Sequence, residues 1–131
     1  MGENIYERDL PKVEANHVSL SPLSFLRRSA DVYPDHPAIV HGDLRRSWSE
    51  VYRRCRQLAS ALNARGIGEG DTVAVLAPNV PPMFEAHFGV PMAGAVLNAI
   101  NTRLDPAAIG FILGHGEAKA VMLDVATFDQ L

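Results

Sequence analysis

The sequence predicts an α/β fold in which an N-terminal helix and a β-hairpin lead into a parallel β-α-β-α-β layer. One observation is a set of three apolar runs, typical of strands that are buried in a parallel sheet. They lie at residues 72–77, 95–100 and 119–123. A second observation is that segments of helical length separate these runs, which implies right-handed crossovers between parallel strands. A third is a Gly-Asp turn at residues 42–43, between two short strand-like segments.

The chain begins with residues 1–20, which show no regular periodicity and are expected to form an extended arm. Ser21 and Pro22 predict a helix start, because a serine hydroxyl caps free N–H groups and proline suits the first turn. This helix should end before Tyr33, since the proline that follows disfavours helical geometry in the preceding residue. Strands at 38–41 and 44–47 would then form the hairpin.

The clearest helix begins at Ser47, because Ser47 and Glu50 fit a capping box. One helical face is apolar up to Gly66, which is expected to end the helix in a left-handed conformation and to close the 21–66 segment. Cys55 lies on this apolar face, so we interpret it as a core residue rather than a nucleophile. Five arginines between residues 45 and 56 favour a solvated helix face, with a phosphate or nucleic-acid patch as the alternative.

Residues 70–124 make up the predicted β-α-β-α-β unit. Prolines within 78–82 break the first apolar run, and a helix is expected over 83–93. Asp105 and Pro106 predict the start of another helix, which runs to about Gly114. Residues 126–131 resemble the opening of a further helix, and few segments are left to cover both faces of a parallel sheet. We therefore expect residues 1–131 to be an incomplete part of a larger domain.

Composition excludes several classes of protein. Hydrophobic residues make up 47% of the chain and charged residues 21%, as in globular domains. The net charge of −3 argues against a dedicated nucleic-acid binder. No apolar run approaches the roughly 20 residues of a membrane span, and the charged N-terminus does not resemble a secretory signal. The single cysteine excludes an internal disulfide and a multi-cysteine zinc site. These features predict a cytoplasmic protein.

No motif in the chain supplies a catalytic residue or a metal site. Dinucleotide and P-loop glycine patterns are absent, and the five histidines lack ligand spacing. In open parallel sheets, ligands bind at the carboxyl ends of the strands, which here carry Asn79, residues 101–103 and Asp124. Arg103 is the best ligand candidate, because a guanidinium can hold a phosphate through two parallel hydrogen bonds. A salt bridge or helix-start contact with Asp105 is the alternative.

Four segments in order resemble the adenylate-forming acyl-CoA synthetases and together span nearly the whole chain. They are R-S-W-S-E-V at 46–51, G-D-T-V-A-V-L-A-P-N at 70–79, G-V-P-M-A-G-A-V-L-N-A-I-N-T-R-L at 89–104 and F-I-L-G-H-G-E-A-K-A-V-M-L-D at 111–124. Residues 47–50 and 89–104 stand where the family has its first two core motifs. The resemblance looks closest to the branch that acts on short- and medium-chain acids. It implies the first part of the family's large N-terminal domain.

The resemblance also implies a two-step ligase reaction. ATP activates a carboxylic acid as an acyl-adenylate, and coenzyme A then displaces AMP, while Mg²⁺ neutralises phosphate charge. Arg103, with Asn101 of the same N-x-R-L segment, would lie near the nucleotide phosphates of coenzyme A. The family's ATP-phosphate loop, ribose-binding aspartate and catalytic lysine have no counterpart in this sequence. The 131-residue chain alone is therefore expected to be inactive, to bind none of these cofactors tightly and to depend on the rest of the polypeptide.

Two alternatives stay open. The chain could be a free-standing α/β binding or dimerisation module without ligase activity. In the ligase interpretation, the polar N-terminal arm could instead drape over a second copy and support a homodimer.

Overall fold

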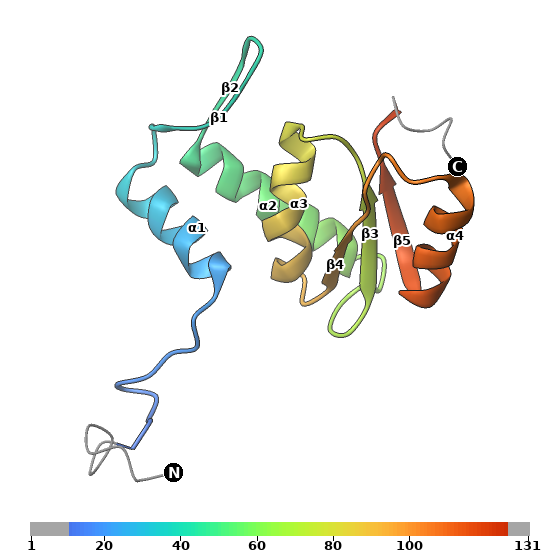
Figure 1. The fold of residues 1–131 in the computed structure, drawn as a ribbon. Helices are drawn as coiled ribbons and strands as arrows, with labels where there is room; N and C mark the ends of the chain where they lie inside the picture. The colour runs from blue at the N-terminus through green and yellow to red at the C-terminus, as the bar shows by residue number, and fades with distance from the viewer. Residues whose placement is uncertain (1–10, 126–131) are drawn as a thin grey trace, which may run out of the picture.

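The computed structural model describes residues 11–125, in which helices and a hairpin flank a three-stranded sheet (Figure 1). In chain order the elements are α1 (Pro22–Val32), β1 (Pro37–His41), β2 (Leu44–Ser47), α2 (Trp48–Asn63), β3 (Thr72–Leu76), α3 (Pro81–Met92), β4 (Val96–Ala99), α4 (Pro106–His115) and β5 (Ala118–Leu123). In Figure 1, α2 and α3 lie between the sheet and the layer formed by α1 and the hairpin. The α/β fold predicted from the sequence is confirmed.

The sheet has the strand order β4-β3-β5, and both neighbours of β3 run parallel to it. Val73 and Val75 of β3 pack into a core with α2 and α3. Ala74 and Leu76, which point to the opposite face, pack against Ile109 of α4. Helices therefore pack on both faces of the sheet at β3.

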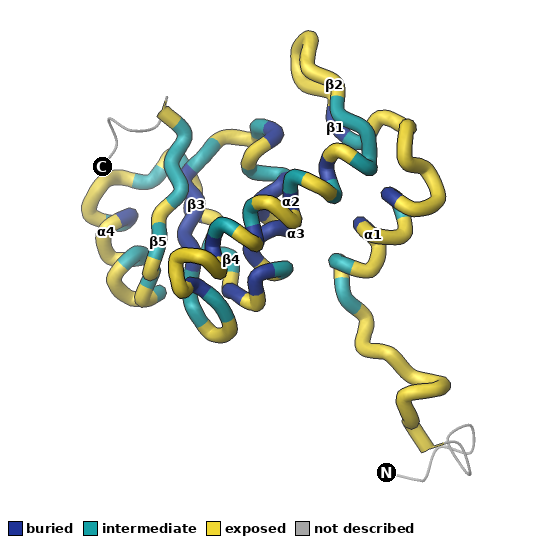
Figure 2. Tube along the Cα trace, turned by 180° about the vertical axis from the view of Figure 1, so that it is seen from behind, coloured by how far each residue is buried: buried dark blue, intermediate teal, exposed yellow. Residues whose placement is uncertain are grey.

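Only β3 is buried along its length, whereas the sequence predicted three fully buried strands. Val96 of β4 is 54% exposed and Val121 of β5 is 41% exposed. The cause is the position of each strand, because β3 has a neighbour on each side and helices on both faces, while β4 and β5 form the edges (Figure 2). An apolar run thus overstated the burial of the edge strands.

A second core joins α1, the hairpin and α2. Leu26 of α1, Ile39 of β1, and Val51 and Cys55 of α2 form one buried cluster. The α2 cap is the predicted capping box: Ser47 Oγ accepts a hydrogen bond from the Glu50 N–H at 3.4 Å, while Glu50 Oε2 accepts one from the Ser47 N–H at 2.8 Å. These contacts fix the direction in which α2 leaves the hairpin.

Helix α3 differs from its prediction at both ends and packs very closely on α2. It begins at Pro81 rather than residue 83, because prolines lack an N–H and fit the first turn of a helix. A Cβ added at Gly89 would lie 2.7 Å from Leu58 Cδ2 and 3.0 Å from Leu58 Cβ. Glycine at position 89 therefore allows α2 and α3 to approach each other as closely as they do.

Some predictions fall on residues that lie outside the described range. The expected helix at 126–131 and the first ten residues of the expected arm are among them. Residues 11–20 are exposed and contain no helix or strand, with a turn at 14–16.

Candidate functional site

A hollow of about 430 Å³ lies at the carboxyl ends of β3 and β4, and we call it the strand-end hollow. It is lined by Ala77, Pro78, Asn79, Met83, Ala99, Ile100, Asn101, Thr102 and Arg103. The chain leaves β3 for α3 on one face of the sheet and leaves β4 for α4 on the other face. In open α/β sheets, such a divergence of adjacent strands opens a crevice in which ligands bind.

Hydrogen bonds within the loop after β4 hold Arg103 at this hollow. Asn101 Oδ1 accepts a hydrogen bond from the Arg103 N–H at 2.9 Å, which makes a tight side-chain turn. Asp105 Oδ1 accepts one from the Ala108 N–H at 2.9 Å and caps α4. The Asp105 carboxylate therefore makes a helix-start contact with Ala108, and within residues 11–125 the Arg103 side chain has no ion pair.

Charge and donor groups make the strand-end hollow suitable for an anion. Arg103 is exposed and is the charged residue of the lining, which includes no acidic side chain. The amide nitrogen of Asn101 and the hydroxyl of Thr102 add hydrogen-bond donors beside it. The structure thus brings Asn79, Asn101 and Arg103 to one edge. Asp124 follows β5 instead, where its N–H donates to Leu76 O at 3.0 Å, and it does not line this hollow.

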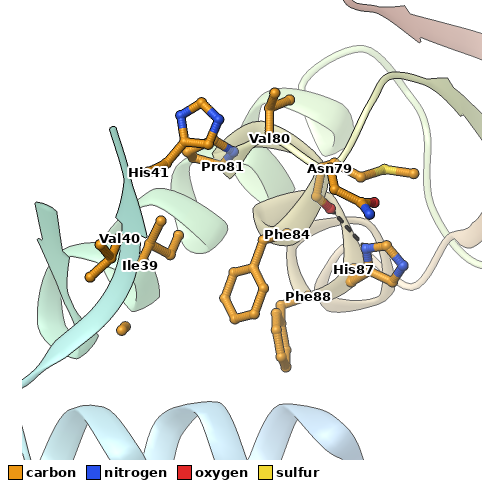
Figure 3. A pocket seen from close by; sticks show the side chains of 11 residues that line it. Ile39, Val40, His41, Asn79, Val80, Pro81, Phe84, His87 and Phe88 are labelled. Atoms are coloured by element: carbon orange, nitrogen blue, oxygen red, sulfur yellow. Dashed lines mark hydrogen bonds between the residues drawn. The ribbon is translucent and has the colours of Figure 1, made fainter. Parts of the chain in front are cut away.

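A second hollow, of about 550 Å³, lies between the hairpin and the first turns of α3, and we call it the apolar hollow (Figure 3). Phe84 and Phe88 point into it from α3, with ring centroids 5.3 Å apart. His87 lies at its edge, and its Nδ1 is 2.8 Å from Met83 O. Asn79 and Met83 line both hollows, so the two are neighbours. The sequence analysis missed this hollow, although aromatic residues four apart at 84 and 88 share a helix face.

Three charged residues form the Glu85 cluster, which consists of Glu85 on α3, Arg46 on β2 and Arg54 on α2. Glu85 is only 5% exposed, and its Oε1 accepts hydrogen bonds from Arg46 Nη1 and from Arg54 Nε, the latter at 2.6 Å. The expectation of a solvated arginine face is therefore wrong for Arg46, whose side chain is 18% exposed, whereas Arg54 pairs with Glu85 while its side chain stays 39% exposed. Glu85 is the sole acidic residue between Asp71 and Asp105, and this isolation in an apolar segment was the signal that could have identified it.

The hydrogen bond that Arg54 donates to Glu85 raises the pKa of Arg54. Beside it, Cys55 Sγ donates to the backbone carbonyl of Glu85 at 3.5 Å. Burial, and then the charge of Glu85, raise the pKa of the Cys55 thiol to about 12. A neutral, fully buried thiol is no nucleophile, in agreement with the interpretation of Cys55 as a core residue.

Residues 11–125 contain neither a cluster of metal ligands nor a membrane-spanning helix. Within that range, no three His, Cys, Asp or Glu side chains lie together as a metal ion would require. No helix of the described segment has the length and apolar character that crossing a bilayer demands.

Comparisons of the sequence with known proteins point to one family. The family model described as "AMP-binding enzyme" matches residues 26–131. An acetate–CoA ligase of Humulus lupulus is 55% identical over 120 residues, which cover 92% of this chain and 21% of the relative. A peroxisomal acetate/butyrate–CoA ligase of Arabidopsis thaliana is 51% identical over 120 residues, with the same shares covered. The chain thus spans about a fifth of the length of these curated relatives.

Solved structures give the same fold. A fatty acyl-CoA synthetase of Mycobacterium tuberculosis superposes with a TM-score of 0.78 at 32% identity, over 82% of this chain and 22% of that one. An O-succinylbenzoate–coenzyme A synthetase of Bacillus subtilis, solved with AMP, superposes with a TM-score of 0.73 over 78% of this chain and 27% of that one. At 24% identity, the latter match concerns the fold alone.

Proposed function

The chain belongs to the family of AMP-binding enzymes, and on that premise we propose that it forms the first part of the large N-terminal domain of an AMP-forming acid–thiol ligase. Residues 21–66 would form its outer layer and residues 70–124 its parallel sheet. The complete enzyme would activate a carboxylic acid with ATP and transfer the acyl group to coenzyme A. Mg²⁺ would neutralise phosphate charge in the first step.

The observation that carries the proposal is the guanidinium of Arg103 at the strand-end hollow, which has no ion pair within residues 11–125. We propose that Arg103 holds a phosphate of coenzyme A, with Asn101 as an additional donor. In support, Arg103 faces a hollow without acidic side chains, and the turn made by Asn101 fixes its backbone. A phosphate gains two parallel hydrogen bonds from one guanidinium, each worth about 1.5–3 kcal/mol when charge-assisted.

The acid is proposed to be small. The names of related ligases specify acetate, butyrate and 2-methylpropanoate, and in two cases the aromatic acids trans-cinnamate and benzoate. Neither the ATP-binding loop nor a catalytic lysine of this family is recognisable in the 131 residues, so we expect this chain alone to be inactive and to bind no cofactor tightly. A cytoplasmic location and a homodimer stay predictions, and several related ligases are named as peroxisomal.

The test compares the two half-reactions of the full-length enzyme that contains this segment. Replacing Arg103 with Ala should raise the KM for coenzyme A at least about tenfold, because loss of roughly 1.4 kcal/mol of binding is tenfold. Acid-dependent exchange between ATP and pyrophosphate should change less than about twofold, since it precedes coenzyme A binding.

The matched control is Arg53→Ala, which removes an exposed arginine of α2 that lies away from the strand-end hollow. The control should leave both half-reactions intact. An unchanged KM for coenzyme A in Arg103→Ala would remove Arg103 from the binding site.

A further inference from the structure

The Glu85 cluster joins three elements through one buried carboxylate. The Glu85 side chain is 7% exposed, and its Oε1 atom accepts hydrogen bonds from both Arg46 of β2 and Arg54 of α2. A carboxylate is costly to bury unless partners replace its water, and here two guanidinium groups from different elements do so. The position of Glu85 is therefore fixed from two directions.

The remaining contacts on this side of α3 anchor the helix against α2. Cys55 Sγ of α2 donates to Glu85 O, and Gly89, four residues on, packs directly against Leu58. Residues four apart share a helix face, so Glu85 and Gly89 form one anchored face of α3. These two contacts fix both the position of α3 along α2 and its rotation about its own axis.

Met83 is the residue of α3 that lines the strand-end hollow. Met83 lies two residues before Glu85, which places it about 200° around the helix axis from the anchored face. Met83 lines the strand-end hollow together with Arg103, and Asn79 lines it from the loop before α3. A rotation of α3 would therefore move Met83 relative to Arg103.

We propose that Glu85 is a positioning residue for coenzyme A binding: its pairs with Arg46 and Arg54 fix the rotation of α3 and thereby the place of Met83 in the strand-end hollow that Arg103 also lines. This inference rests on the proposed function, because it takes the strand-end hollow as the coenzyme A site. Glu85 acts through α3 and touches no ligand.

The test measures both half-reactions in the full-length enzyme with Glu85→Gln, which keeps the size of the side chain and removes its charge. The KM for coenzyme A should rise about three- to tenfold, as is usual for residues that act on a site through intervening contacts. Exchange between ATP and pyrophosphate should change less than about twofold per folded enzyme. Arg54→Gln, which leaves the Arg46 pair in place, should give a smaller rise and serves if Glu85→Gln folds poorly.

Leu62→Ala is the matched control for stability, because Leu62 is buried in α2 away from the cluster. It should lower the Tm and leave the KM for coenzyme A unchanged. Combining Glu85→Gln with Arg103→Ala should raise that KM less than the product of the single effects, since both act on one hollow.

Equal loss of both half-reactions in Glu85→Gln would show a merely structural role and overturn the inference. An unchanged KM for coenzyme A would also overturn it. If Arg103→Ala raises the KM for coenzyme A and neither Glu85→Gln nor Arg54→Gln does, the inference about Glu85 fails while the proposed coenzyme A site stands. If Arg103→Ala has no effect, the proposed site fails.

Discussion

The arginines of the Glu85 cluster and Arg103 carry the same side chain in opposite surroundings. Arg46 and Arg54 face a carboxylate that is 7% exposed, whereas Arg103 faces a hollow with no acidic residue. The partner inside the protein decides the use of the guanidinium, because a carboxylate occupies its donors, whereas a hollow lined by no acidic side chain leaves them for an external anion. The first region is therefore interpreted as structural and the second as ligand-binding.

The two regions are expected to differ most in how much their arginines contribute to stability. Arg46→Ala should lower the free energy of unfolding by about 2–4 kcal/mol, because removing one partner of a buried pair leaves Glu85 under-compensated. Arg103→Ala should change it by less than about 0.5 kcal/mol, as is usual for exposed residues without partners. Denaturant unfolding of the full-length enzyme measures both, and equal losses would contradict the division into a structural and a ligand-binding region.

A glycine in α3 is closely packed, whereas a glycine in α4 has open space around it. Gly89→Ala should destabilise the protein by about 1–3 kcal/mol, because the added Cβ would overlap Leu58 and force α2 and α3 apart. Gly110→Ala in α4 is the matched control, since nothing lies within 4 Å of an added Cβ there. The control should be neutral or stabilising by about 0.5–1 kcal/mol. Equal Tm values for the two variants would argue against a tight contact between α2 and α3.

The thiol beside the cluster offers a chemical readout of burial and charge. Because the pKa of Cys55 is raised from 9.0 to about 12, the folded thiol should react with a thiol reagent at neutral pH at least about a hundredfold more slowly than in denaturant. The raised pKa of Cys55 contributes fully to the stability of the fold below about pH 9, and this contribution is lost as the pH rises toward 12. Rapid native labelling specific to Cys55 would contradict the described packing.

The smallest effect concerns an ion pair at the other end of the sheet. The hydrogen bond from Lys119, followed by that from the Gly68 N–H, lowers the pKa of Asp71. The lowered pKa of Asp71 stabilises the folded state when the pH is above the ordinary pKa of an aspartate. This stabilisation is lost as the pH falls through the pKa of Asp71 in the folded state. Asp71→Asn should therefore lower the Tm slightly at pH 7. At strongly acidic pH, the variant and the unmodified protein should have the same Tm. A Tm difference that stays constant across this range would contradict the pairing.

Local signals in the sequence predicted the elements well, because their causes lie within a few residues. The capping box of Ser47 and Glu50, the cap at Asp105 and the left-handed Gly66, with φ of +74°, are present as expected. Arg103 was also placed correctly at a strand end. Each of these depends on chemistry between neighbours in the chain.

Long-range contacts were the part that local patterns missed. Glu85 pairs with arginines 39 and 31 residues earlier, and no periodicity within α3 or α2 shows which arginine turns inward. The burial of β4 and β5 was overestimated because an apolar run does not show which strand is central. The apolar hollow likewise needs the hairpin and α3 to meet, which their separate sequences do not show.

Equilibrium binding of coenzyme A to the full-length enzyme tests the central claim most directly. The Kd for coenzyme A should rise at least about tenfold in Arg103→Ala relative to the unmodified enzyme and to Arg53→Ala, while the Kd for ATP stays the same. The same Kd for coenzyme A in all three proteins would contradict the assignment of the strand-end hollow as its phosphate site.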